Sequence, residues 1–342
     1  MGAALLGLTI GAVFGAAARI SRFCLLRGMK ALVGGGDRSP LRLFALALAV
    51  AILATQALNL WGLTDLSASL PMRPQFAAGG LFIGGAVFGI GTVMANGCGA
   101  RMLVLLAGGN MRALLVLLCM GLAAQASLTG VLSSLRAALQ LGRFAPEALS
   151  IPALLAFTGI PAGLVTGAVV LAATGALAVY ARPVIVEQRR DAVMGVLIGL
   201  CVAAGWWAVF ATDDPFDPKV LNGLSFVGPV GEGIVWLILS TGRALSFGVA
   251  VVAGTLAGAF AASLLQRSAA LETFTSGRNA LKVAAGGTLM GFGGVLATGC
   301  SIGQGLTGLS TLSLASLVAS LGILSGIAVG LIISRHTSPV GS

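Results

Sequence analysis

Charged side chains are scarce in this sequence, and their scarcity excludes a water-soluble protein. Only 9% of the 342 residues are Asp, Glu, Lys or Arg, whereas 57% are hydrophobic. A soluble surface draws on a charged fraction of about 25%. Because long apolar runs cross a bilayer as helices, which satisfy their own backbone hydrogen bonds, the composition predicts an all-α integral membrane protein.

Histidine and acidic residues are also rare, which narrows the available chemistry. The chain has one His, His336, and ten acidic residues, so a His-rich zinc site and a His-based catalytic triad are excluded. There is no GxxxxGK[ST] motif for ATP hydrolysis. No Asp or Glu lies inside the predicted spans, so a carboxylate proton relay has no groups to use. We predict no cofactor, no metal site and no enzymatic activity.

Nine apolar runs are long enough to cross a membrane, which takes about 17 to 25 residues. They lie at 2–19, 41–62, 76–96, 111–135, 151–180, 192–212, 244–265, 280–298 and 312–334. A tenth run, 233–241, is too short to cross and ends at Gly242-Arg243, so we expect a half-helix there.

The basic residues divide unequally between the two sides of these nine spans. Fifteen of the 20 Lys and Arg residues follow odd-numbered spans, and four follow even-numbered spans: Arg73, Arg136, Arg143 and Lys219. The positive-inside rule then predicts the N-terminus outside, and residue 187 and the C-terminus in the cytoplasm. It also predicts residue 215 outside. The same division accounts for the net charge of +10 without a nucleic-acid partner.

The sequence contains an internal repeat. Residues 84–98 (GGAVFGIGTVMANGC) align without gaps to residues 286–300 (GGTLMGFGGVLATGC) at an offset of 202, with eight of fifteen positions identical. We predict two four-span repeats, 1–150 and 191–342, joined by a linking helix and basic loop at 151–190. Because a single membrane-crossing helix joins them, the second repeat has the opposite orientation in the membrane. Such inverted repeats are typical of secondary transporters. The stretches after Cys98 and Cys300 are predicted to be short re-entrant segments that line a pathway.

The five cysteines show no metal-binding spacing, and two of them share the repeat. Cys98 and Cys300 occupy the same register at a predicted helix break, whereas Cys119 and Cys201 lie within apolar spans as ordinary core residues. Cys24 has no repeat counterpart, because we align its region with 206–212 (WWAVFAT). A neutral thiol can contact a polarisable sulfur anion without adding negative charge. Thiols can also carry a persulfide or bind soft metals, and residue type alone does not separate these chemistries.

Three segments resemble the YeeE/YedE family of sulfur-transport membrane proteins. They are RFC at 22–24, ANGCGARMLVLLAGGN at 95–110 and ATGCSIGQGLTGLSTLSLAS at 297–316. The resemblance implies an hourglass-shaped inverted-repeat fold in the bacterial inner membrane. By motif, it places Cys24, Cys98 and Cys300 on the pathway, where thiosulfate passes by S–H···S contacts. It also implies a small cytoplasmic sulfurtransferase resembling TusA as a partner for some members.

We therefore predict a membrane transporter for thiosulfate or a related sulfur anion. The predicted pathway consists of the three cysteines, the glycines that flank the repeated motif and two arginines: Cys24, Cys98, Cys300, Gly97, Gly99, Gly299, Arg101 and Arg243. One of the arginines would draw the anion toward the cysteines. The alternatives are a membrane sulfurtransferase or thiol-redox protein with a covalent cysteine persulfide, and a transporter of soft metals or selenium species.

Overall fold

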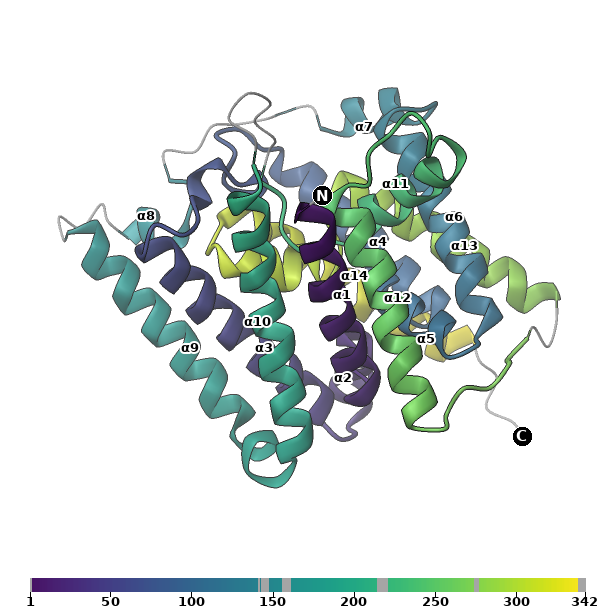
Figure 1. The fold of residues 1–342 in the computed structure, drawn as a ribbon, viewed down its shortest axis with the longest axis horizontal. Coiled ribbons are helices and arrows are strands. Elements are labelled where there is room, and N and C mark those ends of the chain that lie inside the picture. Colours follow the sequence, from purple (N-terminus) through teal and green to yellow (C-terminus); the bar gives the residue numbers. More distant parts are fainter. Residues whose placement is uncertain are drawn as a thin grey trace.

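A computed structural model describes residues 2–140, 142, 148–155, 161–213, 221–273 and 277–337. Every regular element within these ranges is a helix, and three isolated bridges join loops. The prediction of an all-α membrane protein is confirmed (Figure 1). Residue 215 and the side chain of His336 lie outside the description.

Eight described helices are long and apolar enough to cross a membrane. They are α1 (Gly2–Ile20), α3 (Ser39–Leu60), α4 (Ala78–Ala95), α6 (Met111–Leu128), α9 (Ala162–Glu187), α10 (Arg189–Ala211), α12 (Phe247–Leu265) and α14 (Leu314–Thr337). The ninth expected span is α13 (Gly277–Leu296), which has 20 residues but is not in this apolar set. Its first turns carry Arg278 and Lys282, and it packs against α4 and α6.

Several described helices are too short to span the hydrocarbon core, and four of them, here called the four short helices, correspond between the two halves. They are α2 (Leu25–Gly34), α5 (Gly99–Ala107), α11 (Val227–Ile238) and the π-helix η4 (Gly303–Gly308). Even a helix of 12 residues reaches only about 18 Å, against about 30 Å of hydrocarbon. The short segments expected after Cys98 and Cys300 are thus present. The expected half-helix at 233–241 begins six residues earlier, and α2 was not expected.

Two predicted spans have different bounds in the structure. The run 111–135 is divided: α6 ends at Leu128, and α7 (Ser133–Leu139) follows the turn at Gly130, whose missing side chain leaves room for close approach to Ala126. The run 151–180 contains α8 (Ile151–Leu155), while α9 continues to Glu187. Residues 156–160 lie outside the description. The one-turn helices η1 (Leu66–Ala68) and η2 (Leu70–Met72) connect α3 to α4.

Each of the following contacts between a helix of the first half and a helix of the second half occurs twice, with the roles of the two halves exchanged. Helix α1 packs on α12 as α10 packs on α3, and α4 packs on α14 as α13 packs on α6 (Figure 1). The α1–α12 contact is close because a Cβ atom on Gly254 or Gly258 would collide with the backbone of α1. The two halves therefore share one core rather than folding as separate bodies.

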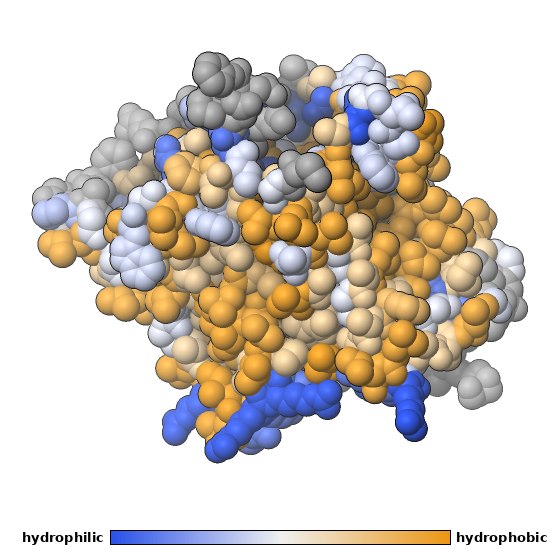
Figure 2. All heavy atoms as spheres, viewed as in Figure 1, coloured by the Kyte–Doolittle hydropathy of each residue, from blue (hydrophilic) through white to orange (hydrophobic). Residues whose placement is uncertain are grey.

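The starts of α3, α10 and α13 mark one end of the molecule, here called the basic end. Gln188 Nε2, between α9 and α10, donates to Ser39 Oγ at 3.2 Å, and Arg19 Nη2 donates to Ser268 Oγ at 2.9 Å. Hydrophilic residues gather along the lower edge of the molecule below an apolar band (Figure 2). At the opposite end, Ser313 Oγ donates to the Pro71 carbonyl at 2.5 Å.

Candidate functional site

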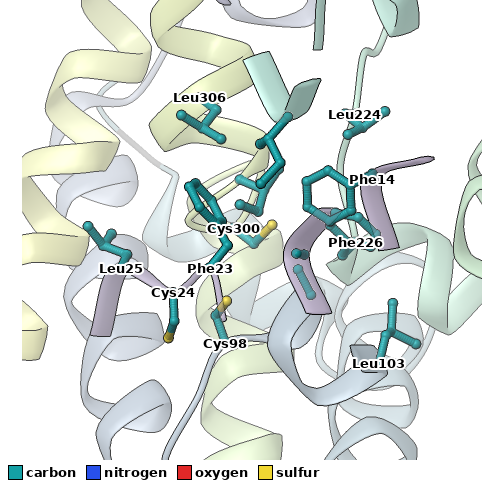
Figure 3. Close-up of a cluster of buried hydrophobic side chains, with 14 of the residues drawn as sticks. Phe14, Phe23, Cys24, Leu25, Cys98, Leu103, Leu224, Phe226, Cys300 and Leu306 are labelled. Carbon is teal, nitrogen blue, oxygen red and sulfur yellow. The ribbon is translucent and has the colours of Figure 1, made fainter. Parts of the chain in front are cut away.

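Three of the predicted site residues meet in the centre of the molecule. Cys24 immediately precedes α2, Cys98 immediately precedes α5, and Cys300 lies three residues before η4. All three are buried, with exposed fractions of 2%, 5% and 1%. Cys98 lies within electrostatic range of the other two, and Figure 3 draws it between them. Cys119 and Cys201 lie within α6 and α10.

The positive ends of two short helices lie at this cysteine cluster. The side chain of Cys24 does not cap α2, whereas the thiol of Cys98 interacts with the backbone N–H of Arg101 in the first turn of α5. The backbone N–H of Gly303 donates to Cys300 Sγ at 3.3 Å. Because helix N-termini carry partial positive charge, the cluster favours an anion over a cation.

The predicted glycines let the turns around the cysteines close. A Cβ atom on Gly97 would collide with Met102 Cε, and one on Gly99 would lie 3.0 Å from Met120 Sδ. A Cβ atom on Gly299 would lie 3.0 Å from Gln304 Cγ. The structure therefore gives these glycines a packing function beside the cysteines.

A strained backbone position fixes Cys300. Thr298 has φ of 55°, in the left-handed region that β-branched residues avoid. Gln304 Nε2 donates to Thr298 Oγ1 at 2.8 Å and to the Ala297 carbonyl at 2.9 Å, which holds the turn in this conformation. Asn96, the repeat counterpart of Thr298, has φ of 62°.

The structure corrects the repeat alignment of Cys24. Residues 206–212 belong mostly to the long helix α10, whereas Phe226 precedes α11 as Cys24 precedes α2, at the offset of 202. Phe226 is fully buried, and its ring centroid lies 5.2 Å from that of Phe14. Three of the four short helices thus follow a cysteine, and the fourth follows an aromatic residue.

Two cavities of similar size lie at opposite ends of α4 and α13. One cavity lies at the end of the molecule opposite the basic end and is here called the opposite-end cavity. It has a volume of about 520 Å³, and Thr298, two residues before Cys300, lines it. The basic-end cavity has a volume of about 500 Å³ and reaches Arg101, three residues after Cys98. A third and much smaller cavity of about 10 Å³, here called the constriction, is lined by Cys24 and Cys98 and shares Arg101 with the basic-end cavity.

The two cavities are related by the sequence repeat. Six residues that line the opposite-end cavity have counterparts, offset by 202, among the residues that line the basic-end cavity. The pairs are Leu70 and Glu272, Ala77 and Asn279, Leu81 and Val283, Met94 and Leu296, Asn96 and Thr298, and Ala113 and Ala315. Exchange of the two ends is the relation that inverted repeats predict.

Both cavities are lined by cations. Arg73 and Arg136 line the opposite-end cavity, and the basic-end cavity has four cations: Lys30, Arg101, Arg112 and Lys282. Arg101 also lines the constriction beside Cys24 and Cys98. Arg243 instead lies in an exposed turn after α11, where its carbonyl accepts from the Trp236 indole at 3.1 Å.

Sequence reasoning missed Arg73, Arg136 and Ser301 as site residues. The two arginines carried a usable signal, because they are two of only four basic residues assigned to their side. Ser301 is buried, and its hydroxyl interacts with the thiol of Cys98. Across the described ranges, no group of three or more His, Cys, Asp or Glu side chains is arranged to hold a metal ion.

Comparison with known proteins identifies the family. The sulphur transport family matches residues 20–329, which cover nearly the whole chain and include all three clustered cysteines. The chain belongs to this family. The resemblance noted in the three sequence segments is thereby confirmed.

Two curated relatives are both named thiosulfate transporter TsuA. The chain is 26% identical to that of Escherichia coli (strain K12), over 88% of this chain and 86% of the relative. It is also 26% identical to that of Spirochaeta thermophila, over 94% of this chain and 96% of the relative.

Proposed function

We propose that this protein imports thiosulfate across the bacterial inner membrane. The observation that carries the proposal is the cluster of three buried thiols at the positive ends of α2 and α5, between two cationic cavities. The names of the two TsuA relatives support the same substrate. The neutral thiols suit the terminal sulfur of thiosulfate, and the helix ends suit its charge.

The anion passes the cysteines in a fixed order. It enters the opposite-end cavity, passes Thr298 to Cys300, moves to Cys98 and Cys24, and leaves through the basic-end cavity. The proposal uses neutral S–H groups, because thiolates would repel the anion. No covalent bond to sulfur forms.

The constriction must widen for each passage. A cavity of about 10 Å³ holds at most about one water molecule, which is smaller than thiosulfate. In the proposed cycle, this arrangement corresponds to a closed state. Exchange of the two repeat conformations would open one end as it closes the other.

The basic end faces the cytoplasm in this proposal, with the N-terminus outside. The basic residues after the odd-numbered spans support this orientation. Residues 1–150 and 191–342 form the inverted repeats and 151–190 links them, with membrane lipid around the apolar band. A TusA-like sulfurtransferase would receive the anion at the basic end.

Uptake of labelled thiosulfate by a host that lacks sulfate and thiosulfate uptake tests the proposal. We expect the wild-type gene to support growth on thiosulfate as sole sulfur source. Cys98→Ala and Cys300→Ala are expected to abolish uptake at normal protein abundance, since they remove the thiol and little packing volume. Cys119→Ala is the matched control and is expected to leave uptake near the wild-type rate. Full uptake by Cys300→Ala would remove the basis of the proposal.

A membrane sulfurtransferase is the second candidate, because adjacent thiols can also exchange sulfur covalently. Mass spectrometry of the intact protein after exposure to thiosulfate separates the two. A persulfide or thiosulfonate adduct on Cys98 or Cys300 is required by the sulfurtransferase, and the transporter is expected to remain unmodified.

A further inference from the structure

The two repeat-related cavities differ in charge. The basic-end cavity has four cations and the opposite-end cavity has two. None of these four cations has a basic repeat counterpart: Lys30 corresponds to Glu232, Arg101 to Gly303, Arg112 to Leu314 and Lys282 to Gly80. The extra positive charge therefore does not follow from the repeat architecture and requires its own explanation.

The cations of the basic-end cavity come from separate elements and approach one another. Lys30 on α2 lies within electrostatic range of Arg101 on α5 and Lys282 on α13. Like charges repel at such separations unless an anion lies between them. Lys30 Nζ donates to Asn96 Oδ1 at 2.5 Å, whereas Arg101 Nε is buried without a partner.

The carboxylate in this cavity is already engaged. Among the described residues that line it, Glu272 is the acidic one, and its carboxylate accepts from the Asn110 side chain. Arg112 Nε donates to the Thr273 carbonyl at 3.0 Å, which places this arginine at the rim near Glu272. Among the described lining residues, the four cations therefore outnumber the one carboxylate, and the cavity keeps an excess of positive charge.

We infer that the basic-end cavity is a second anion site, which binds a divalent tetrahedral sulfur oxyanion after it leaves Cys24 and Cys98. The inference rests on the proposed function for its role in transport, although binding itself does not require transport. Arg101 connects the two places because it lines both the cavity and the cysteine constriction. Guanidinium and ammonium groups bind such oxyanions through charge-assisted hydrogen bonds.

The site makes transport sensitive to sulfate on the basic side. Sulfate has the charge and the oxygens that the cations recognise, but it lacks the terminal sulfur of thiosulfate. It would therefore occupy the basic-end cavity without competing for the thiols. Sulfate at this side would slow thiosulfate uptake by blocking release, which couples uptake to the internal oxyanion concentration.

Sulfate binding to the purified full-length protein tests the site directly. In nanodiscs of zwitterionic lipid, measured by calorimetry at low ionic strength, we expect Lys282→Gln to weaken sulfate binding about tenfold. Arg278→Gln removes the same charge one turn earlier on α13, outside the cavity lining, and is expected to change binding less than about twofold. Cys98→Ala is expected to retain binding.

Absence of sulfate binding, or equal losses in Lys282→Gln and Arg278→Gln, would overturn the inference. Nanodiscs that contain phosphatidylglycerol provide a further arm. If sulfate binds in zwitterionic lipid but not beside anionic lipid, a headgroup phosphate occupies the cavity and the soluble-anion site is wrong. None of these measurements depends on transport, so failure of the proposed function would be visible separately as absent thiosulfate uptake.

Proteoliposomes test the consequence for uptake. With the basic end facing the lumen, internal sulfate is expected to lower the initial rate of thiosulfate uptake relative to internal gluconate at equal ionic strength. Lys282→Gln is expected to relieve this inhibition, and Arg278→Gln is expected to preserve it. Equal inhibition of both variants would contradict the assignment of the site.

Discussion

Arg136 provides the sharpest test of how the anion reaches the cysteines. It lines the opposite-end cavity, and its Nε atom is buried without a hydrogen-bond partner. A roughly spherical cavity of about 520 Å³ has a radius of about 5 Å, which puts the guanidinium charge about 7 Å from an anion at its centre. We expect Arg136→Gln to weaken the attraction of the anion and to raise the KM for thiosulfate.

The size of the effect follows from the charge and the distance. For a divalent anion at about 7 Å in water, the interaction is about 1.2 kcal/mol, or about sevenfold in KM at low ionic strength. At physiological salt, a screening length of about 8 Å reduces it to about 0.5 kcal/mol, or about twofold. The maximal rate is expected to change less, because the cysteines and the constriction are intact.

Initial rates of thiosulfate uptake at several ionic strengths measure this effect. Arg136→Lys keeps the charge and is expected to stay near wild type. Arg243→Gln, at an exposed turn away from the cavity lining, is expected to change KM less than Arg136→Gln does. An unchanged KM in Arg136→Gln at low salt, or a larger rise in Arg243→Gln, would refute the reasoning.

Two other predictions concern packing and orientation. A Cβ atom on Gly258 would collide with Ala12 on α1, whereas one on Gly167 of α9 would have no neighbour within 4 Å. Gly258→Leu is therefore expected to destabilise the fold by about 1–3 kcal/mol or more, and Gly167→Leu to be tolerated, as thermal unfolding in detergent will show. A reporter fused after Glu187 is expected to be cytoplasmic and one at residue 215 external. External labelling at Glu187 would be incompatible with the proposed orientation.

The fold was largely predictable because lipid limits a chain of this composition to helices. The long apolar runs gave the spans, and the repeat at 84–98 and 286–300 indicated both short segments that follow a cysteine. The remaining differences have local causes. Helix α2 has apolar residues at helical spacing, but Arg27 and Lys30 interrupt its hydrophobic run. The end of α9 extends past Arg182 and Pro183, where composition alone suggests a loop.

The sequence indicated the three cysteines of the candidate site but only some of the cations that line its cavities. Cys98 and Cys300 were identified because they occupy the same position of the internal repeat, at a predicted helix break, which indicates a common role. The contribution of Arg136 depends on α7 turning back over the opposite-end cavity, which hydropathy does not encode. The counterpart of Cys24 was misaligned because the repeat offset is not constant over the first helices: α1 ends at Ile20 and α10 at Ala211.

The narrow constriction at Cys24 and Cys98 bears on how the cell keeps its membrane potential. A space of about 10 Å³ beside these cysteines cannot hold a continuous file of water. Protons move rapidly only along connected hydrogen bonds, and Phe14, Phe23 and Ile302 supply none at this point. In the proposed pathway, a sulfur anion would exchange contacts with the thiols as the walls part, whereas a proton would find no unbroken chain of hydrogen bonds. Under the proposed function, a closed centre of this kind would allow a transporter with a cavity at each end to remain in an energised membrane without discharging it.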